Sequence, residues 1–239
     1  MTTIARKIAL AAVGAVLVLG VAVGLALSLH TGTAAAAATR MYGDPATAAP
    51  YWRMQSLDDC GLMAAADVIG QLTKREVSER EIVAVAQQLP SRTHRGPMYT
   101  LPKDTGDPNS TGYGTDPADL PTLLAQYRIT ATFASTEDDD AAAETGMAAL
   151  ERYLAGGHKV IAGVNAELLW GIPVQTRDQN GNPTADHAVV VTGVDTASGK
   201  VHLNDSGNPN GRDETVPLDV FAKSWATSGD QMIVTEQTS

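Results

Sequence analysis

The stretch from Met54 to Ala66 constrains the fold of this chain more than any other. It places Asp58 and Asp59 directly before Cys60, and the run of small apolar residues that follows is typical of a closely packed helix. Either aspartate can act as the N-cap, so Cys60 is expected in the first helical turn. There the unpaired backbone N–H groups and the helix dipole favour an anion, and they raise the thiolate fraction of a cysteine.

Cys60 is the single cysteine of the 239 residues, so no disulfide can form within the chain and the fold depends on its hydrophobic core. A lone cysteine is often a buried, inert side chain. In an exported protein it can also pair with another chain. The helix-start position and the polar residues before it favour a reactive thiol.

A reactive cysteine needs a base, and the base needs a group that holds its orientation. His187 begins a run of apolar residues that predicts a strand, and Asp205 ends the next predicted strand, after a turn over residues 195–199. If the two strands pair, the carboxylate of Asp205 can reach the imidazole. Asp186 and Asn204 are alternatives to Asp205, and the alternation of side chains along a strand favours Asp205 over both.

Three motifs together resemble the C39-like group of papain-fold cysteine peptidases. They are Gln55 with Asp59-Cys60-Gly61, the strand that begins His187-Ala188-Val189, and Asn204-Asp205-Ser206 in the next strand. The resemblance covers residues 51–234. It implies a papain-like α+β fold in which N-terminal helices pack on a mostly antiparallel sheet. The order of the predicted elements agrees, because most of the helices precede most of the strands.

The resemblance also implies a role for four residues. Cys60 is the nucleophile, His187 is the base, Asp205 orients the base, and Gln55 donates to the oxyanion hole. Gln55 stands one position closer to the cysteine than in most papain-like enzymes. On this interpretation the protein is an exported cysteine peptidase or amide hydrolase with a Cys-His-Asp triad, and its partner is a peptide or protein substrate. The alternative is a non-catalytic peptide-binding module on a peptidase-like fold at the cell envelope, suggested by the acidic pair and by the displaced Gln55.

Composition narrows the classes of partner. The chain is 44% hydrophobic and 18% charged, which suits one globular domain after the N-terminal segment. Its formal net charge is -10. Binding of nucleic acid or of an anionic membrane surface needs clustered Lys and Arg, so neither is expected. The acidity is interpreted as a contribution to solubility outside the cell.

The N-terminal segment has the layout of an export signal. Arg6 and Lys7 precede an apolar run over residues 8–29, and alanines fill residues 34–38. The run is also long enough to span a bilayer. We therefore expect a signal peptide or N-terminal membrane anchor over residues 1–38, a linker over 39–50, and a C39-like domain over 51–239. The protein would then be secreted, or anchored on the outer side of the cytoplasmic membrane through this segment alone.

Hydrophobic periodicity and turn residues predict the other elements. Helices are expected over residues 60–72 and 78–89, after Pro117, and over 137–155 and 217–225. Strands are expected over 129–133, 159–164, 187–194, 200–205 and 231–236. The connections 91–115 and 165–186 are unusually long, and Tyr113 and Trp170 on them are candidates either to wall a peptide cleft or simply to pack.

No cofactor and no metal are predicted. The other histidines have no metal-ligand spacing with one another or with Cys60, and no phosphate-binding or dinucleotide-binding glycine motif occurs.

Overall fold

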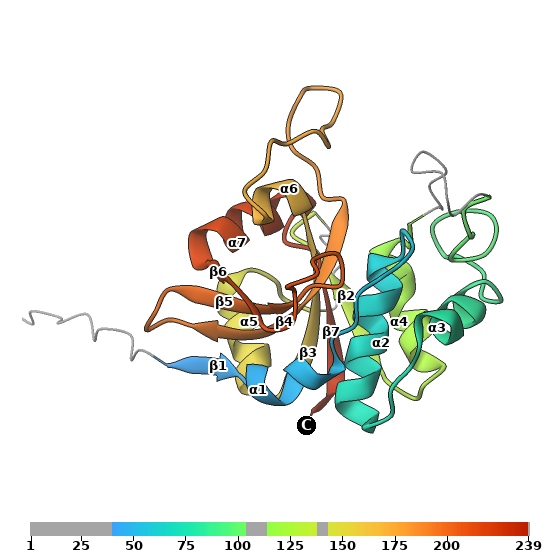
Figure 1. Cartoon of the computed structure of the whole chain (residues 1–239), viewed down its shortest axis with the longest axis horizontal. Coiled ribbons are helices and arrows are strands. Elements are labelled where there is room, and N and C mark those ends of the chain that lie inside the picture. The colour runs from blue at the N-terminus through green and yellow to red at the C-terminus, as the bar shows by residue number, and fades with distance from the viewer. Residues whose placement is uncertain (1–39, 104–113, 138–142, 239) are drawn as a thin grey trace, which may run out of the picture. The chain divides into compact units, whose positions relative to one another are not determined.

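The computed structural model describes residues 40–103, 114–137 and 143–238, in which helices flank a seven-stranded sheet (Figure 1). The described strands are β1 (Met41–Gly43), β2 (Ala131–Ala134), β3 (His158–Val164), β4 (His187–Asp195), β5 (Lys200–Asn204), β6 (Glu214–Pro217) and β7 (Met232–Thr238). The described α-helices are α1 (Pro45–Ala48), α2 (Cys60–Thr73), α3 (Glu79–Ala86), α4 (Leu120–Ala125), α5 (Met147–Ala155), α6 (Ala166–Leu169) and α7 (Leu218–Trp225).

The sheet order is β2-β7-β3-β4-β5-β6, and every pair of neighbouring strands is antiparallel. β3 pairs with the first half of β4, from His187 to Val191, and β1 pairs with the second half. β4 and β5 form the expected hairpin, so the end of β5 returns to the start of β4. The expected α+β architecture is confirmed.

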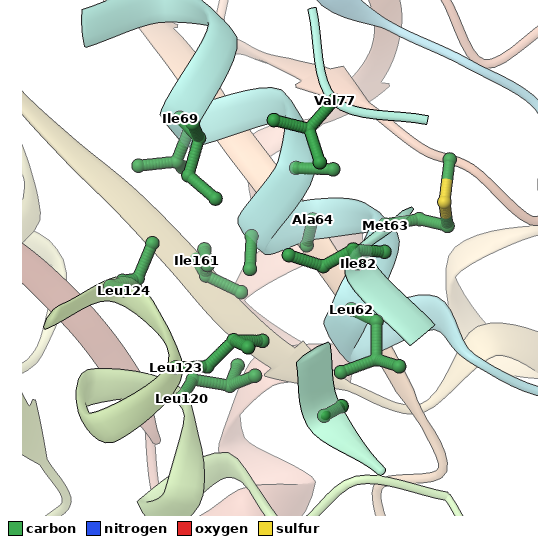
Figure 2. Close-up of a cluster of buried hydrophobic side chains, with 14 of the residues drawn as sticks. Leu62, Met63, Ala64, Ile69, Val77, Ile82, Leu120, Leu123, Leu124 and Ile161 are labelled. Atoms are coloured by element: carbon green, nitrogen blue, oxygen red, sulfur yellow. The ribbon is translucent and has the colours of Figure 1, made fainter. Parts of the chain in front are cut away.

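The two faces of the sheet carry separate hydrophobic clusters, because successive strand residues point to opposite sides. On β3, Ile161 packs with α2, α3 and α4, whereas Val160 and Ala162 pack with α5 and α7. Figure 2 shows the first cluster, in which Leu62 and Ile69 of α2 meet the leucines of α4. The sheet is thus covered on both faces, and α2 lies directly against β4.

α2 begins at Cys60, as the sequence predicts, and nearly all of its following residues are buried. Its small residues allow close packing. A side chain at Gly70 would meet the ring of Tyr51 at 2.6 Å. The helix ends at Thr73, and its C-cap Lys74 adopts a left-handed φ of 59° and donates its N–H to the Gly70 carbonyl. Burial of this helix fixes the position of its first turn against the sheet.

Two expectations about elements are wrong. The segment 39–50, expected as a linker, contains β1 and α1, because the second half of β4 offers a free edge where β3 ends. Pro45 stands in the first turn of α1 and Pro50 in a 3-10 helix over Ala49–Tyr51, positions where proline is tolerated, so the two prolines do not mark a linker. The helix expected over 137–155 begins only at Met147, because Gly146 has a φ of 91° that leaves the helical path. Part of the expected helix, residues 138–142, lies outside the described residues.

The expected signal or anchor over residues 1–38 also lies outside the described residues. Among those that are described, no helix combines the length and the apolar composition needed to cross a membrane.

Candidate active site

Cys60 and His187 line one cavity of about 270 Å³ between the start of α2 and the sheet. Apolar side chains of α4, β3 and β7 form much of its wall, and Asp58 and Asp186 also contribute to it. The thiol of Cys60 is partly exposed, and it is the first helical residue of α2. The N–H groups of this first turn have no partner within the helix, so they can stabilise negative charge at the cavity wall.

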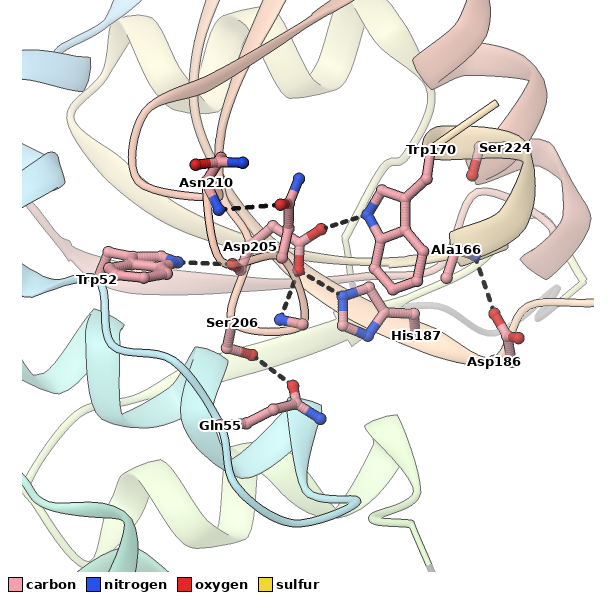
Figure 3. A network of polar contacts seen from close by, with 12 residues as sticks. Trp52, Gln55, Ala166, Trp170, Asp186, His187, Asp205, Ser206, Asn210 and Ser224 are labelled. Carbon is pink, nitrogen blue, oxygen red and sulfur yellow. Dashed lines mark hydrogen bonds and ion pairs between the residues drawn. The ribbon is translucent and has the colours of Figure 1, made fainter. Parts of the chain in front are cut away.

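His187 and Asp205 form a buried pair (Figure 3). The imidazole Nε2 lies 2.7 Å from Oδ1 of Asp205, with 6% and 0% of the two side chains exposed. Asp205 also accepts hydrogen bonds from the Gly207 N–H and from the Trp170 indole, each at 2.8 Å. The β4–β5 hairpin brings the pair together, because Asp205 directly follows β5 and His187 begins β4.

The pair carries charge. Burial alone would lower the pKa of His187, but hydrogen bonds to Asp205 and Cys60 and the negative charges of both raise it to about 10. Burial likewise opposes ionisation of Asp205, yet the hydrogen bonds from His187, Trp170 and Gly207 and the charge of His187 hold the pKa of this carboxyl below its usual value. Asp205 occupies Nε2, so Nδ1 is the ring nitrogen that remains for other partners.

Trp170 lies over the imidazole with ring centroids 5.5 Å apart, immediately after α6. It therefore contacts both members of the His187–Asp205 pair. Gly207 allows this arrangement, because a Cβ there would stand 2.9 Å from Cε1 of His187 and 3.2 Å from Trp170. Sequence analysis gave Trp170 only a role in packing or in walling a cleft. The other candidate for that role, Tyr113, lies outside the described residues.

The two alternatives to Asp205 lie elsewhere. The Asp186 carboxylate accepts hydrogen bonds from the Ala166 N–H at 2.9 Å and from the Thr176 hydroxyl at 2.8 Å. Asn204 donates to the buried Asp67 of α2 at 2.8 Å and to the Ala48 carbonyl at 3.0 Å. Neither side chain contacts His187 in these hydrogen bonds, and the Asn204 contacts tie β5 to α2 instead.

Gln55 lies beside Ser206 (Figure 3). Its Oε1 accepts a hydrogen bond from the Ser206 hydroxyl at 2.8 Å, and its backbone N–H donates to the Ser206 carbonyl. Its Nε2 donates to the Leu57 carbonyl at 2.9 Å, which uses one of the two amide hydrogens. These hydrogen bonds hold Gln55 between Ser206, which follows Asp205, and Leu57, which precedes Cys60. Gln55 is not among the described residues that line the cavity.

Glu79, the first residue of α3, holds the segment before Cys60 and was missed by sequence analysis. Its carboxylate accepts hydrogen bonds from the N–H and hydroxyl of Ser56, both at 2.6 Å, and from the Leu57 N–H at 3.1 Å. Asp59 lies beside Glu79 and is fully buried. Apart from this contact with Glu79, its carboxyl oxygens have no hydrogen-bond partner among the described residues. Burial and the charge of Glu79 raise the pKa of Asp59 to about 7.

Asp59→Asn is therefore expected to stabilise the fold at alkaline pH. In the unfolded chain Asp59 ionises near its ordinary pKa of about 3.9, whereas in the fold it keeps its proton up to about pH 7. The free energy of unfolding therefore falls as pH rises between these two values. The side-chain amide of the Asp59→Asn variant does not ionise, so the variant avoids this fall. We expect a gain on the order of 1 to 3 kcal/mol at pH 8 and little change at pH 4. Thermal unfolding at both pH values measures this, with the exposed Asp58→Asn as control, and an equal effect of Asp59→Asn at both would contradict it.

The described residues contain no group of three or more His, Cys, Asp or Glu side chains arranged to hold a metal ion.

Comparison with known proteins places this chain in a family. The Peptidase_C39 like family matches residues 31–233. Uncharacterized proteins from Mycobacterium tuberculosis and Mycobacterium bovis are each 59% identical over 214 residues, covering 88% of this chain and 90% of the relative. A solved structure from Bacillus anthracis, assigned to the C39-like peptidases, has the same fold, with a TM-score of 0.52 and 19% identity over 80% of this chain and 96% of that one. The chain belongs to the Peptidase_C39 like family.

Proposed function

We propose that this protein is a cysteine peptidase or amide hydrolase in which Cys60 is the nucleophile, His187 the general acid and base, and Asp205 the group that orients it. One observation carries the proposal. His187 holds the buried Asp205 with its Nε2, and His187 and Cys60 line the same cavity at the start of α2. A cysteine beside a histidine whose orientation is fixed by a third group is the arrangement that amide cleavage by cysteine requires.

The first half of the reaction forms an acyl-enzyme. The Cys60 thiolate attacks the carbonyl carbon of the substrate, and the C–S bond forms as the carbonyl oxygen becomes an oxyanion. The imidazolium of His187 then gives its proton to the leaving nitrogen, the C–N bond breaks, and the amine departs. Asp205 stabilises the imidazolium before this transfer and holds its Nε2, so that Nδ1 stays directed at the reacting atoms.

The second half returns the enzyme to its starting state. Neutral His187 accepts a proton from water, the water oxygen attacks the thioester carbon, and the C–S bond breaks to release the acid and the thiolate. An amine in place of water would give acyl transfer with the same residues. Backbone N–H groups at the start of α2 are placed to stabilise the oxyanion of both halves, and a second hydrogen of the Gln55 amide is a further candidate donor.

The cavity suits a peptide substrate with an apolar side chain. Leu120, Ile161 and Ile233 supply apolar surface, and Gly61 and Gly163 leave room for a substrate to approach the sheet. Asp58 and Asp186 at the same cavity disfavour an acidic side chain there.

Hydrolysis of a peptide library, followed by mass spectrometry of the products, tests the proposal. The wild-type protein is expected to give new termini, and Cys60→Ala and Cys60→Ser are expected to give none. Peptide cleavage that survives in Cys60→Ala would overturn it. Peptide binding of equal affinity in wild type and Cys60→Ala, with no cleavage by either, would support the binding module instead.

We also propose that the domain acts outside the cytoplasm, on the basis of the basic residues and the apolar run of its N-terminal segment. Fractionation of cells that express the full chain tests this, and recovery of the protein only from the cytoplasm would contradict it.

A further inference from the structure

A second cavity lies at the other end of α2 from Cys60 and gathers positive charge. It has a volume of about 370 Å³, and its walls come from β1, α1, the last turn of α2, the end of α5 and the start of β3. Three cations line it, Arg40, Lys74 and Lys159, against the single carboxylate of Asp44. The whole chain has a net charge of -10, so the charge gathered at this cavity is opposite in sign to that of the chain.

None of the three cations forms an ion pair within the described parts of the chain. The Lys74 ammonium donates to the Gln71 carbonyl at 2.8 Å, and the Arg40 guanidinium lies 4.7 Å from the centre of the Tyr42 ring. Both contacts position a positive charge without neutralising it. Asp44 is already used as the N-cap of α1, where its carboxylate accepts the Thr47 N–H at 3.2 Å.

Lys159 is the most informative of the three. It is half-buried, and its pKa is lowered by burial and by the nearby charge of Lys74, with only partial compensation from Asp44 and Asp67. Asp67 is a weak counter-charge, because its own burial raises its pKa to about 7 and its oxygens accept hydrogen bonds from Gln71 and Asn204. A desolvated cation without a full counter-charge gains free energy when an anion binds beside it.

The geometry points to a binding site for a tetrahedral oxyanion, phosphate or sulfate, either free or as the end group of a larger molecule, in the cavity between Lys74, Lys159 and Arg40. The three cations line one cavity from separate elements, the end of α2, the start of β3 and the chain just before β1. That arrangement suits an anion with acceptors in several directions better than it suits a planar carboxylate with two. The site does not depend on the chemistry proposed for Cys60.

Lys159→Met tests the proposal in the full-length protein, because it removes the charge and keeps most of the side-chain length. In sodium chloride the variant is expected to be as stable as wild type or more so, since it lacks a desolvated cation. Inorganic phosphate at matched ionic strength is expected to raise the wild-type Tm in a saturable way, and calorimetric titration is expected to show binding that Lys159→Met weakens at least about tenfold. Lys223→Gln, on α7 and exposed, is the matched control and should bind phosphate as wild type does.

The outcomes separate cleanly. An unsaturable rise in Tm shared equally by wild type, Lys159→Met and Lys223→Gln would be a general salt effect and would overturn the site. Acetate that binds as tightly as phosphate would overturn the tetrahedral preference. Glycerol phosphate that binds more tightly than inorganic phosphate would support an end group as the ligand, and the reverse would support the free ion.

Discussion

Asp205→Ala is expected to lower kcat/KM for peptide hydrolysis by about a thousandfold, whereas Asp205→Asn should cost far less. Alanine removes the carboxylate that accepts hydrogen bonds from His187, Trp170 and Gly207. The imidazole then loses the group that orients it, and the other two donors are left buried without a partner. Asparagine keeps an oxygen for His187 Nε2 but removes the charge. The pair of variants therefore separates orientation of the base from stabilisation of its positive form.

The pH profile gives the sharper readout of the same change. The pKa of His187 is raised from its ordinary value of about 6.5 to about 10, so the imidazolium persists well above pH 6.5 and is lost as pH rises through about 10. Hydrolysis by wild type should therefore fall on the alkaline side near that value, because neutral imidazole cannot protonate the leaving nitrogen. In Asp205→Asn the alkaline limb should move to lower pH.

The chain contains a matched control for this experiment. His202 and Asp213 form a second pair, with Nδ1 2.7 Å from the carboxylate, but it is partly exposed and does not line the cavity of Cys60. Asp213→Asn should leave both the rate and the pH profile unchanged. Equal profiles for wild type and Asp205→Asn would contradict the assigned role of Asp205, whatever the loss of rate in the alanine variant.

His187→Ala is expected to slow alkylation of Cys60 by iodoacetamide about a hundredfold at pH 6. An ordinary thiol with a pKa of about 8.5 is ionised to only about 0.3% at that pH. His187 lines the same cavity as Cys60, and an imidazolium beside a thiol is expected to favour the thiolate, which is the species that reacts.

The single cysteine makes this measurement unambiguous, since every labelled molecule reports on Cys60 and Cys60→Ser sets the background. His202→Ala is the control for loss of a histidine from the domain. A His187→Ala protein that is folded, by its circular dichroism, and labels at the wild-type rate would show that the two side chains do not act as a pair. The proposed peptidase activity would then lose its physical basis.

Short-range patterns were sufficient to predict the parts of the site that lie on regular elements. The start of α2 follows from an acidic pair before a run of small residues, and the β4–β5 hairpin follows from two apolar runs around a turn. Alternation along β5 also separates Asp205 from Asn204, and the structure places the two side chains against different neighbours, His187 and Asp67. These features depend on residues close together in the sequence.

The groups that support the site depend on distant segments and left no comparable pattern. Trp170 hydrogen-bonds Asp205 from a long connection whose sequence has no helical or strand period. Glu79, at the start of α3, holds a residue that lies more than twenty positions earlier in the sequence. β1 was missed because three residues are too short to show alternation, and its partner edge exists only where β3 ends. Tertiary pairing, and not local propensity, determines such elements.

Pairing of β1 has a consequence for the mature form of the protein. A chain shortened at its N-terminus keeps β1 only if the cut lies before Met41, because Met41, Tyr42 and Gly43 pair along the second half of β4. A shorter product that began at residue 51 would expose a row of unpaired N–H and C=O groups there, and unpaired strand edges recruit other chains into aggregates. β1 therefore protects the second half of β4 from edge-to-edge association with other chains.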